Sequence, residues 1–505
     1  MVALCLCEIE NLSRDKHVES KFVPRLDEGS NPSRSTLHIN INMKNLFKIG
    51  AGLCCFLFLS CAQSGSGLLF DGINHSKWTF SGHTEVSEGI LNLSDAGAQA
   101  ILKNGQYKDF TLSLELRTTK GGKGAIWFHT DQGLSKGYSV AINNDRDDPV
   151  WWRMSGSLLS VRNLTKSFVK ENDWFTMDIT VQGKAINVFI NGFPVVEYIE
   201  PATPFRNGDF ASSLLSSGTF ALISEGTGTI QFRSISVTAL DSKETDIQAQ
   251  LAEAIDEQTD PIIRLHQEDF PVLDYHIHLK GGMNKEETAG WSRKTGINYA
   301  IAPNCGVGFP ITDDAGVLAY LDSMRSQPFI LVMQAEGREW VTTFSQEVRD
   351  EFDYVFTDAM TFSDHKGRRT RIWIPEETHI DNEQQYMDLI VDRICSVLQE
   401  PMDVYVNSCF IPAQMQDRYD AFWTEVRQDK FIDALKKSGK ALEINNRYRI
   451  PNKSIIQKAK AAGVKFTFGT NNAGANDMGK MEYAIQMKAE CGLTAQDMYK
   501  PKIKI

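Results

Sequence analysis

The periodicity of the chain changes near residue 241, and this change limits what the chain can fold into. Before it, short alternating apolar and polar stretches are separated by Gly, Asn and Asp, which is typical of antiparallel strands. After it, apolar runs alternate with longer amphipathic segments, which is typical of parallel strands joined by crossover helices. We therefore expect a multi-domain protein, with an all-β domain followed by an α/β domain.

The composition favours a globular protein without a nucleic-acid partner. The 505 residues are 42% hydrophobic and 23% charged, with a formal net charge of -11, and no Lys/Arg-rich block offsets that charge locally. A surface of this sign repels phosphate backbones. The length predicts two or three domains.

The first 61 residues contain a pattern typical of an export signal. A short basic stretch, 43–48, precedes an apolar or small run, 49–60, and then Cys61. That order indicates a secretory signal, and the run is too short to cross a bilayer as a stable helix. Leu59-Ser60-Cys61 resembles the lipobox of bacterial lipoproteins, with Phe58 an unusual residue three positions before the cysteine.

The resemblance implies an envelope lipoprotein on the periplasmic or outer-membrane face, held to the membrane by lipid on Cys61. We predict that residues 1–61 are an extension plus a signal peptide, with Met43 as the true start. The alternative for residues 1–42 is a genuine disordered extension.

Residues 62–240 predict a β-sandwich of two packed antiparallel sheets. Clear strands are 110–116, 125–128 and 185–190, and Asn191-Gly192 is a strong hairpin-turn signal. Four landmarks, spread in order along this span, carry a family resemblance: Leu69-Phe70-Asp71-Gly72, Gly121 to Phe128, Gly137-Tyr138 and Phe232-Arg233-Ser234-Ile235. In them the span resembles the 3-keto-disaccharide hydrolase domain, a concanavalin-like jelly roll.

The sandwich departs from that family where its polar residues are expected. The family's arginine and glutamate are replaced here by His129 and Ser139. A glycosidase normally needs paired carboxylates, and the nearby acids, Asp131, Asp145, Asp147 and Asp148, are of the kind that structures loops. Trp151 and Trp152 are predicted to stack on a sugar substrate, or alternatively to form a core or edge pair.

Residues 241–270 are acidic and contain an i, i+4 apolar stripe, which predicts a helical linker interrupted at Pro261. The last domain, 271–505, predicts a TIM-like α/β barrel of seven strands, one fewer than usual. The predicted strands are 272–277, 299–302, 329–333, 353–356, 402–406, 441–444 and 464–468. The clearest predicted helices are 382–399, 416–437 and 453–462.

Polar residues follow or end the predicted strands, where barrel enzymes hold their catalytic groups. His276 and His278 share one face of the first strand because side chains alternate. Two imidazoles, with Glu336 and Glu443 from later strands, predict a divalent metal site. The alternative is a pair of strand histidines satisfied by hydrogen bonds.

This half resembles the polymerase and histidinol phosphatase (PHP) superfamily of metal-dependent hydrolases. The residues that carry the resemblance are His276-Ile277-His278, Glu336, Leu442-Glu443-Ile444-Asn445 and Phe468-Gly469-Thr470. Asn304, Asn407 and Asn471 stand where the family has acids or histidines, so the resemblance implies one or two metals (Zn, Mn or Fe) held by His276, His278, Glu336 and Glu443. The amidohydrolase superfamily is the second choice, since its later histidines are missing.

A metal-bound water needs a proton acceptor, for which Asp358 and His365 are the predicted catalytic residues. The predicted substrate-binding residues of this half are Arg338, Asn407, Asn445 and Asn472. The basic run from Lys366 to Arg371 either holds an anion or is a solvated loop. The sequence thus predicts an envelope hydrolase acting on glycans or glycosides. The alternatives are a 3-keto-glycoside hydrolase active in the sandwich and a non-catalytic carbohydrate-binding lipoprotein.

Overall fold

The computed structural model describes residues 66–504. These residues fall within one compact unit of the chain, Ser64–Ile505. The predicted lipidation site, Cys61, lies outside the described residues and stays a prediction. Among the residues described, no helix has the length and apolar character needed to cross a membrane.

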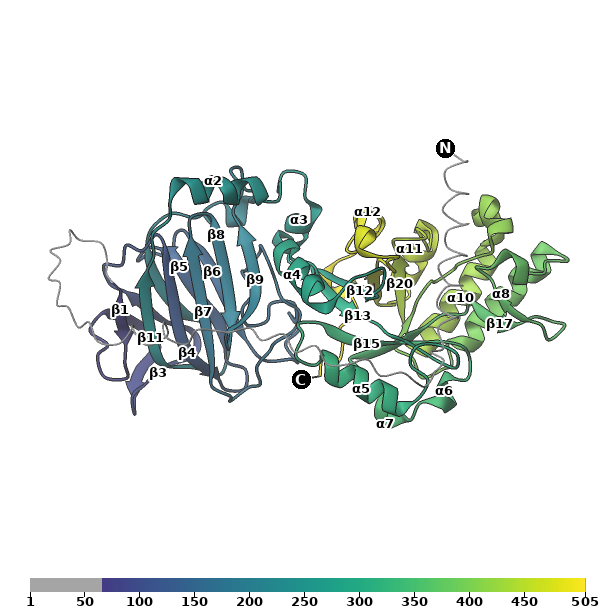
Figure 1. Ribbon diagram of the computed structural model, residues 1–505, viewed down its shortest axis with the longest axis horizontal. Coiled ribbons are helices and arrows are strands. Elements are labelled where there is room, and N and C mark those ends of the chain that lie inside the picture. The colour runs from purple at the N-terminus through teal and green to yellow at the C-terminus, as the bar shows by residue number, and fades with distance from the viewer. Residues whose placement is uncertain (1–65, 505) are drawn as a thin grey trace, which may run out of the picture. The chain divides into compact units, whose positions relative to one another are not determined.

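The N-terminal half is one antiparallel sheet that curls around its own core (Figure 1). The strand order is β6-β5-β10-β3-β11-β4-β7-β8-β9, with β1 on β11 and β2 on β3. The bounds are β1 Gly67–Phe70, β2 Trp78–Ser87, β3 Ile90–Leu102, β4 Phe110–Thr118, β5 Lys123–Thr130, β6 Tyr138–Asn143, β7 Phe175–Gln182, β8 Ala185–Ile190, β9 Phe193–Ile199, β10 Thr219–Ser224 and β11 Thr229–Ala239.

The long strand β3 is the reason that two layers form one sheet. Its first part pairs with β11 through Leu91–Ser94, and its last part pairs with β10 through Gln99–Ile101. Between them, Asp95 and Gly97 have φ values of 64° and 89°, a left-handed conformation that bends the strand. The expected jelly-roll-like packing is therefore present, but the layers are continuous.

Local sequence explains the sandwich elements well. In β4, Leu112, Leu114 and Leu116 are buried and alternate with partly exposed residues, as a half-buried strand requires. Asn191 and Gly192 join β8 to β9 with positive φ values of 51° and 75°, so the predicted hairpin turn is present.

The linker is two short helices, α2 Glu244–Glu253 and α3 Pro261–Gln267. Asp260 caps α3 by accepting a hydrogen bond from the backbone N–H of Ile262, and Pro261 occupies the first turn. The interruption predicted at Pro261 is therefore present.

The C-terminal half is a nearly closed parallel barrel with the strand order β12-β13-β15-β16-β19-β20-β21. Strands β12, β13, β15 and β20 are labelled in Figure 1. The strands on this path are β12 Leu273–Ile277, β13 Asn298–Ile301, β15 Ile330–Ala335, β16 Tyr354–Thr357, β19 Val404–Tyr405, β20 Ala441–Asn445 and β21 Phe466–Gly469, and β14 Asn304–Cys305 pairs with β15. The first and last strands meet where Asn471 N–H donates to the carbonyl of His276 at 2.8 Å.

Helices and a hairpin connect these strands. They are α4 Lys285–Thr295, α5 Asp314–Met324, α6 Trp340–Thr343, α7 Gln346–Arg349, the hairpin β17 Thr361–Ser363 and β18 Arg369–Arg371, α8 Glu383–Val397, α9 Tyr419–Phe422, α10 Glu425–Ser438, α11 Lys453–Ala461 and α12 Glu482–Cys491. The helix predicted over 416–437 is in fact α9 and α10, because Trp423 leaves the helical conformation between them (φ -82°, ψ 62°).

The β6–β7 connection, residues 144–174, packs against the barrel half. Trp151 and Trp152 belong to the same hydrophobic cluster as the barrel strands. Asn298 donates to the carbonyl of Asn163 at 2.9 Å, and Lys166 donates to the carbonyl of Phe329 at 2.7 Å. We call this region of contact the seam.

Candidate functional site

Polar side chains from the ends of β12, β15 and β20 meet inside the barrel mouth. His276 and His278 project from the end of β12, Gln334 comes from β15 and Glu443 from β20. All of them are buried, and Glu443 and His276 are fully so. The predicted convergence of strand ends is therefore what the structure shows for these residues.

Glu443 fixes the ring of His276. Its Oε1 lies 2.6 Å from His276 Nδ1, while its Oε2 accepts hydrogen bonds from the backbone N–H of Asn407 at 2.7 Å and from Asn445 Nδ2 at 2.9 Å. Two N–H donors on Oε2 suit a carboxylate. His276 Nδ1 therefore carries a hydrogen and donates a hydrogen bond to Glu443.

His278 is fixed in a matching way. Its Nδ1 lies 2.8 Å from the carbonyl of Ala302, which can only accept, so this nitrogen also carries a proton. Asn472 clamps the His278 backbone, accepting from its N–H at 2.8 Å and donating to its carbonyl at 3.0 Å.

These partners leave two acceptor nitrogens facing each other. The Nε2 atoms of His276 and His278 are 3.1 Å apart, and Gln334 Oε1 is 3.3 Å from His276 Nε2. In neutral rings whose Nδ1 atoms donate, each Nε2 presents a lone pair. Three electron-rich atoms, the two Nε2 nitrogens and Gln334 Oε1, then lie together, and a cation beside them would be stabilised.

A divalent cation beside these atoms would be held by His276, His278 and the Gln334 oxygen, whereas the predicted set of four ligands also includes Glu443 and Glu336. Glu443 lies behind His276, and Glu336 lies behind Gln334, accepting from Gln334 Nε2 at 2.9 Å. Within residues 66–504, accordingly, no group of three or more His, Cys, Asp or Glu side chains is arranged to hold a metal ion.

The two predicted proton acceptors differ in their connection to this cluster. Asp358 Oδ2 accepts from Asn407 Nδ2 at 2.8 Å, and Asn407 Oδ1 accepts from Asn471 Nδ2 at 2.8 Å. Asp358 and Asn471 are both partly exposed. His365 lies exposed in the β17–β18 turn, and no hydrogen bond in the described part of the chain joins it to the cluster.

Three predicted substrate-binding residues of the barrel need correction. Asn445 and Asn472 are fully buried, and their amides are occupied by Glu443 and His278. Arg338 forms an ion pair with Glu400 at 3.0 Å and also donates to Thr357 Oγ1. These side chains support the site from behind, because the two asparagine amides and the Nη1 and Nη2 atoms of Arg338 already have partners.

The basic run behaves as a structured loop. Lys366 pairs with Asp381, Arg368 with Asp364, and Arg371 with Glu377. These three pairs favour the alternative of a solvated loop over an anion clamp, although Arg369 is exposed and forms no ion pair within the described residues.

The two tryptophans predicted to bind sugar also need correction. Trp151 and Trp152 are each only 3% exposed, and Trp152 Nε1 donates to Asp269 at 2.8 Å across the seam. Stacking on a sugar needs an open ring face. Both indoles instead fill the hydrophobic cluster of the barrel half, which is the core alternative.

In the sandwich, the positions that differ from the family are a buried histidine and a serine. His129 Nε2 lies 2.8 Å from the Lys108 carbonyl, and its Nδ1 accepts from the Ser216 N–H at 3.2 Å. Burial lowers the pKa of His129 to about 4, so the ring is neutral. Ser139 pairs across the strands with Trp127.

The acidic side chains near His129 and Ser139 form hydrogen bonds and an ion pair that hold loops in place. Asp131 accepts hydrogen bonds from the backbone of Gly133 and Ser135. Asp148 is buried and pairs with Lys123 at 2.7 Å. No pair of uncommitted carboxylates is therefore evident here among the described residues.

Two residues of the barrel cluster were not predicted. Gln334 stands two residues before Glu336, and Asp274 stands two residues before His276, so strand alternation places each on the same face as a predicted residue. Asp274 accepts from the backbone N–H of Thr470 at 2.9 Å and so joins β12 to β21. Burial raises the pKa of Asp274 to about 6.

The cysteines within the described residues, Cys305, Cys395, Cys409 and Cys491, are free thiols.

Comparison with known families supports the predicted relationship for the sandwich. Residues 65–238 match the family described as the 3-keto-alpha-glucoside-1,2-lyase-like domain. This span is the same one in which the sequence landmarks occur. No curated protein matches the chain.

Similar solved structures include two proteins of Parabacteroides distasonis ATCC 8503, both described as glycosyl hydrolases by inference. One is 15% identical, covering 35% of this chain and 94% of its own, with a TM-score of 0.32. The other is 20% identical, covering 35% and 99%, with a TM-score of 0.30. The carbohydrate-binding module CBM66 of Bacillus subtilis is 16% identical, covering 32% and 96%, with a TM-score of 0.25. The relationship of this chain to a carbohydrate-related family therefore rests only on the family match over residues 65–238.

Proposed function

We propose that this protein is a carbohydrate-directed hydrolase of the cell envelope whose chemistry takes place at the barrel mouth. The observation that carries the proposal is the pair of acceptor nitrogens on His276 and His278, 3.1 Å apart. Zn²⁺, Mn²⁺ or Fe²⁺ is the proposed cofactor, held by these two nitrogens and the Gln334 oxygen. When bound, such a metal supplies an acidified water and polarises the bond to be cleaved.

The protein's own groups would then orient the substrate and accept the proton. Asp358 is the proposed base because it is partly exposed and hydrogen-bonded through Asn407 to the cluster. Asn304 and Asn471 are also partly exposed, and although their Nδ2 atoms donate to Glu336 and Asn407, their amide oxygens can accept from substrate hydroxyls. The buried members, Glu443, Asn445 and Asn472, keep the two imidazoles in one orientation.

The sandwich supports the choice of a carbohydrate substrate. It matches a family described by a glucoside-cleaving activity over residues 65–238, while its acids are used within loops. We therefore assign it to sugar binding, and we assign Cys61 to lipid anchoring. That anchor would place the enzyme on the periplasmic or outer-membrane face.

Metal uptake by the full chain is the decisive experiment. Equilibrium dialysis against Zn²⁺, Mn²⁺ and Fe²⁺ is expected to give one tightly bound ion per chain. The paired substitution His276→Ala/His278→Ala should abolish it. His379→Ala is the matched control, since His379 is an exposed histidine outside the cluster. If the wild-type protein takes up none of these ions, the metal-dependent proposal fails. The non-catalytic carbohydrate-binding alternative then takes its place.

A second candidate function is cleavage of 3-keto-glycosides in the sandwich, which the family match favours. The same paired variant separates the two proposals. Glycoside cleavage that survives in His276→Ala/His278→Ala would assign the activity to the sandwich. Cleavage that falls in proportion to metal occupancy would assign it to the barrel.

A further inference from the structure

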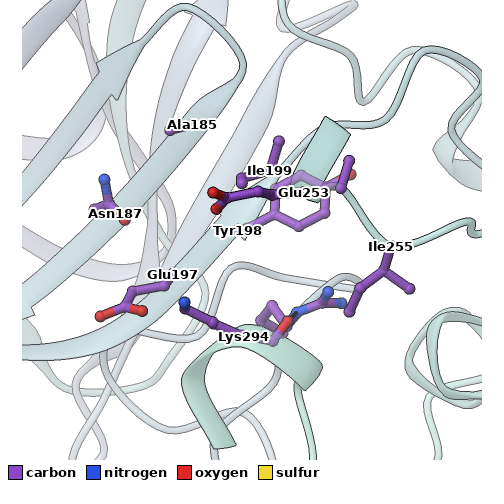
Figure 2. Close-up of a pocket in the computed structure, with 10 residues that line it drawn as sticks. Ala185, Asn187, Glu197, Tyr198, Ile199, Glu253, Ile255 and Lys294 are labelled. Atoms are coloured by element: carbon purple, nitrogen blue, oxygen red, sulfur yellow. Dashed lines mark hydrogen bonds between the residues drawn. The ribbon is translucent and has the colours of Figure 1, made fainter. Parts of the chain in front are cut away.

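A small cavity lies where β8 and β9 meet the end of α2 and the end of α4. Its volume is about 200 Å³. That volume is enough for one small molecule. Figure 2 shows Asn187 and Ile199 on the sandwich side, with Lys294 on α4. None of the residues assigned to the barrel mouth lines it.

The cavity wall is amphipathic. Tyr198, Ile199 and Ile255 provide apolar surface, while Asn187 and Glu253 provide polar atoms (Figure 2). Such a wall suits a molecule with both C–H and hydroxyl surface.

Arg162 lines the same cavity and is a buried cation without a direct ion pair, and the carboxylates of Asp260 and Glu257 act on it only through space. It is 3% exposed, and no Asp or Glu oxygen of the described residues lies within 4.0 Å of its nitrogens. Its Nε donates to the Lys294 carbonyl at 3.1 Å and its Nη1 to the Val161 carbonyl at 2.8 Å. Its guanidinium also lies 5.1 Å from the centre of the Tyr198 ring.

This arrangement is energetically incomplete. Carbonyls and a ring face satisfy some N–H groups, and Asp260 and Glu257 offset the charge only from a distance. Burying a charge without a direct partner is costly. The remaining nitrogen, Nη2, makes no hydrogen bond within the described residues. Burial accordingly lowers the pKa of Arg162.

The remaining charges around the cavity leave it receptive to an anion. Glu197 is already paired with Arg293 at 2.8 Å. Lys294 adds a second positive charge at the opening, and Glu253, at the exposed edge, is the acid that opposes it.

We propose that this cavity binds a small molecule bearing one compact anionic group, with that group against Arg162 and Lys294. A sugar acid matches the whole wall, because Asn187 and Glu253 can bond its hydroxyls and the apolar side its C–H face. A free inorganic anion would make only the contacts with Arg162 and Lys294.

Calorimetric titration of the full chain distinguishes these sources. D-glucuronate is expected to bind with one site per chain, and D-glucose, which lacks the charge, at least tenfold more weakly. Sulfate tests the bare anion. Tighter binding of glucuronate than of sulfate supports a sugar acid, and equal or tighter binding of sulfate assigns the cavity to an inorganic anion.

Variants test the residues that carry the proposal. Lys294→Met should weaken glucuronate binding severalfold, and Glu253→Gln should strengthen it, and both residues are exposed enough for substitution without unfolding. Arg162→Met should weaken it at least tenfold where the variant folds. The proposal is overturned if neither anion binds, or if binding is indifferent to both Lys294→Met and Glu253→Gln.

Discussion

The buried histidines of the seam and of the barrel mouth use their ring nitrogens in opposite ways. In the seam, His266 has Nε2 3.0 Å from the Gly296 carbonyl, to which it donates, while its Nδ1 accepts from the Asn163 N–H at 3.4 Å. Each nitrogen has the complementary partner, so the neutral ring is complete. At the mouth, His276 and His278 both donate from Nδ1, and their acceptor nitrogens meet at 3.1 Å.

This difference shows that burial alone does not separate a structural histidine from a functional one. His266 and His276 are equally inaccessible, at 0% exposure. The two histidines differ in whether each nitrogen of the neutral ring has a complementary hydrogen-bond partner. Both nitrogens of His266 have complementary partners in the neutral ring, whereas His276 Nε2 lies beside a nitrogen and an amide oxygen that also carry lone pairs.

The largest expected effect tests the seam as a structural region. Trp152→Ala removes an indole from the hydrophobic cluster and its bond to Asp269, so it should lower the free energy of unfolding by about 3–5 kcal/mol. Urea denaturation measures this. Trp291→Ala is the control, because Trp291 is 48% exposed, and it should change stability by less than about 1 kcal/mol. Equal losses in the two variants would remove the distinction between buried and exposed tryptophan.

The next effect is the acid sensitivity of the seam. Burial lowers the pKa of His266 to about 3 from an ordinary value of 6.5. The folded state therefore binds fewer protons than the unfolded state between these values, and stability falls as the pH drops below about 6.5. Down to pH 4 the loss attributable to this ring is roughly 3 kcal/mol at most.

Denaturation curves at several pH values check this sign. His266→Gln should flatten the dependence between pH 6.5 and 4, leaving the part due to His129, while the exposed His379→Gln should leave the slope as in the wild type. A slope unchanged in His266→Gln would mean that the ring is not held neutral in the folded protein.

Sequence patterns predicted the barrel mouth better than the seam for a physical reason. The strand ends of a parallel barrel meet by topology, so residues such as His276, His278 and Glu443 are brought together whatever the details of packing. The seam depends on contacts between segments more than a hundred residues apart, such as Asn163 with Asn298. Nothing in the local pattern around Trp151 and Trp152 distinguishes a sugar platform from a core pair.

Within the mouth, the sequence predicted which residues converge but not which atoms face which. Alternation places Gln334 with Glu336, and Glu443 with Asn445, yet it does not say which carboxylate faces the imidazoles directly. That choice depends on hydrogen bonds, such as those of Asn407 and Asn445 to Glu443. Bends such as the one in β3 likewise depend on backbone conformations that alternation does not encode.

Glu443→Gln sharpens the comparison at the mouth. The amide would no longer be a charged acceptor for His276 Nδ1, so the ring loses orientation and basicity, and affinity for a divalent cation should fall about 10- to 100-fold. Competition with a metal indicator measures this. A loss as complete as that of His276→Ala would instead place Glu443 among the direct ligands.

The smallest expected effect concerns Glu336, which would influence the proposed cation only through its hydrogen bond with Gln334. Its Oε1 accepts from Gln334 Nε2 at 2.9 Å and from Asn304 Nδ2 at 2.6 Å. Glu336→Gln keeps an acceptor oxygen at this place, so Gln334 should stay oriented and cation affinity should fall less than about tenfold. Glu339→Gln removes an exposed acid nearby and controls for the change in overall charge. If Glu336→Gln abolishes binding while Gln334→Ala preserves it, the carboxylate contacts the ion directly, and the ligand set implied by the family resemblance replaces the amide proposed here.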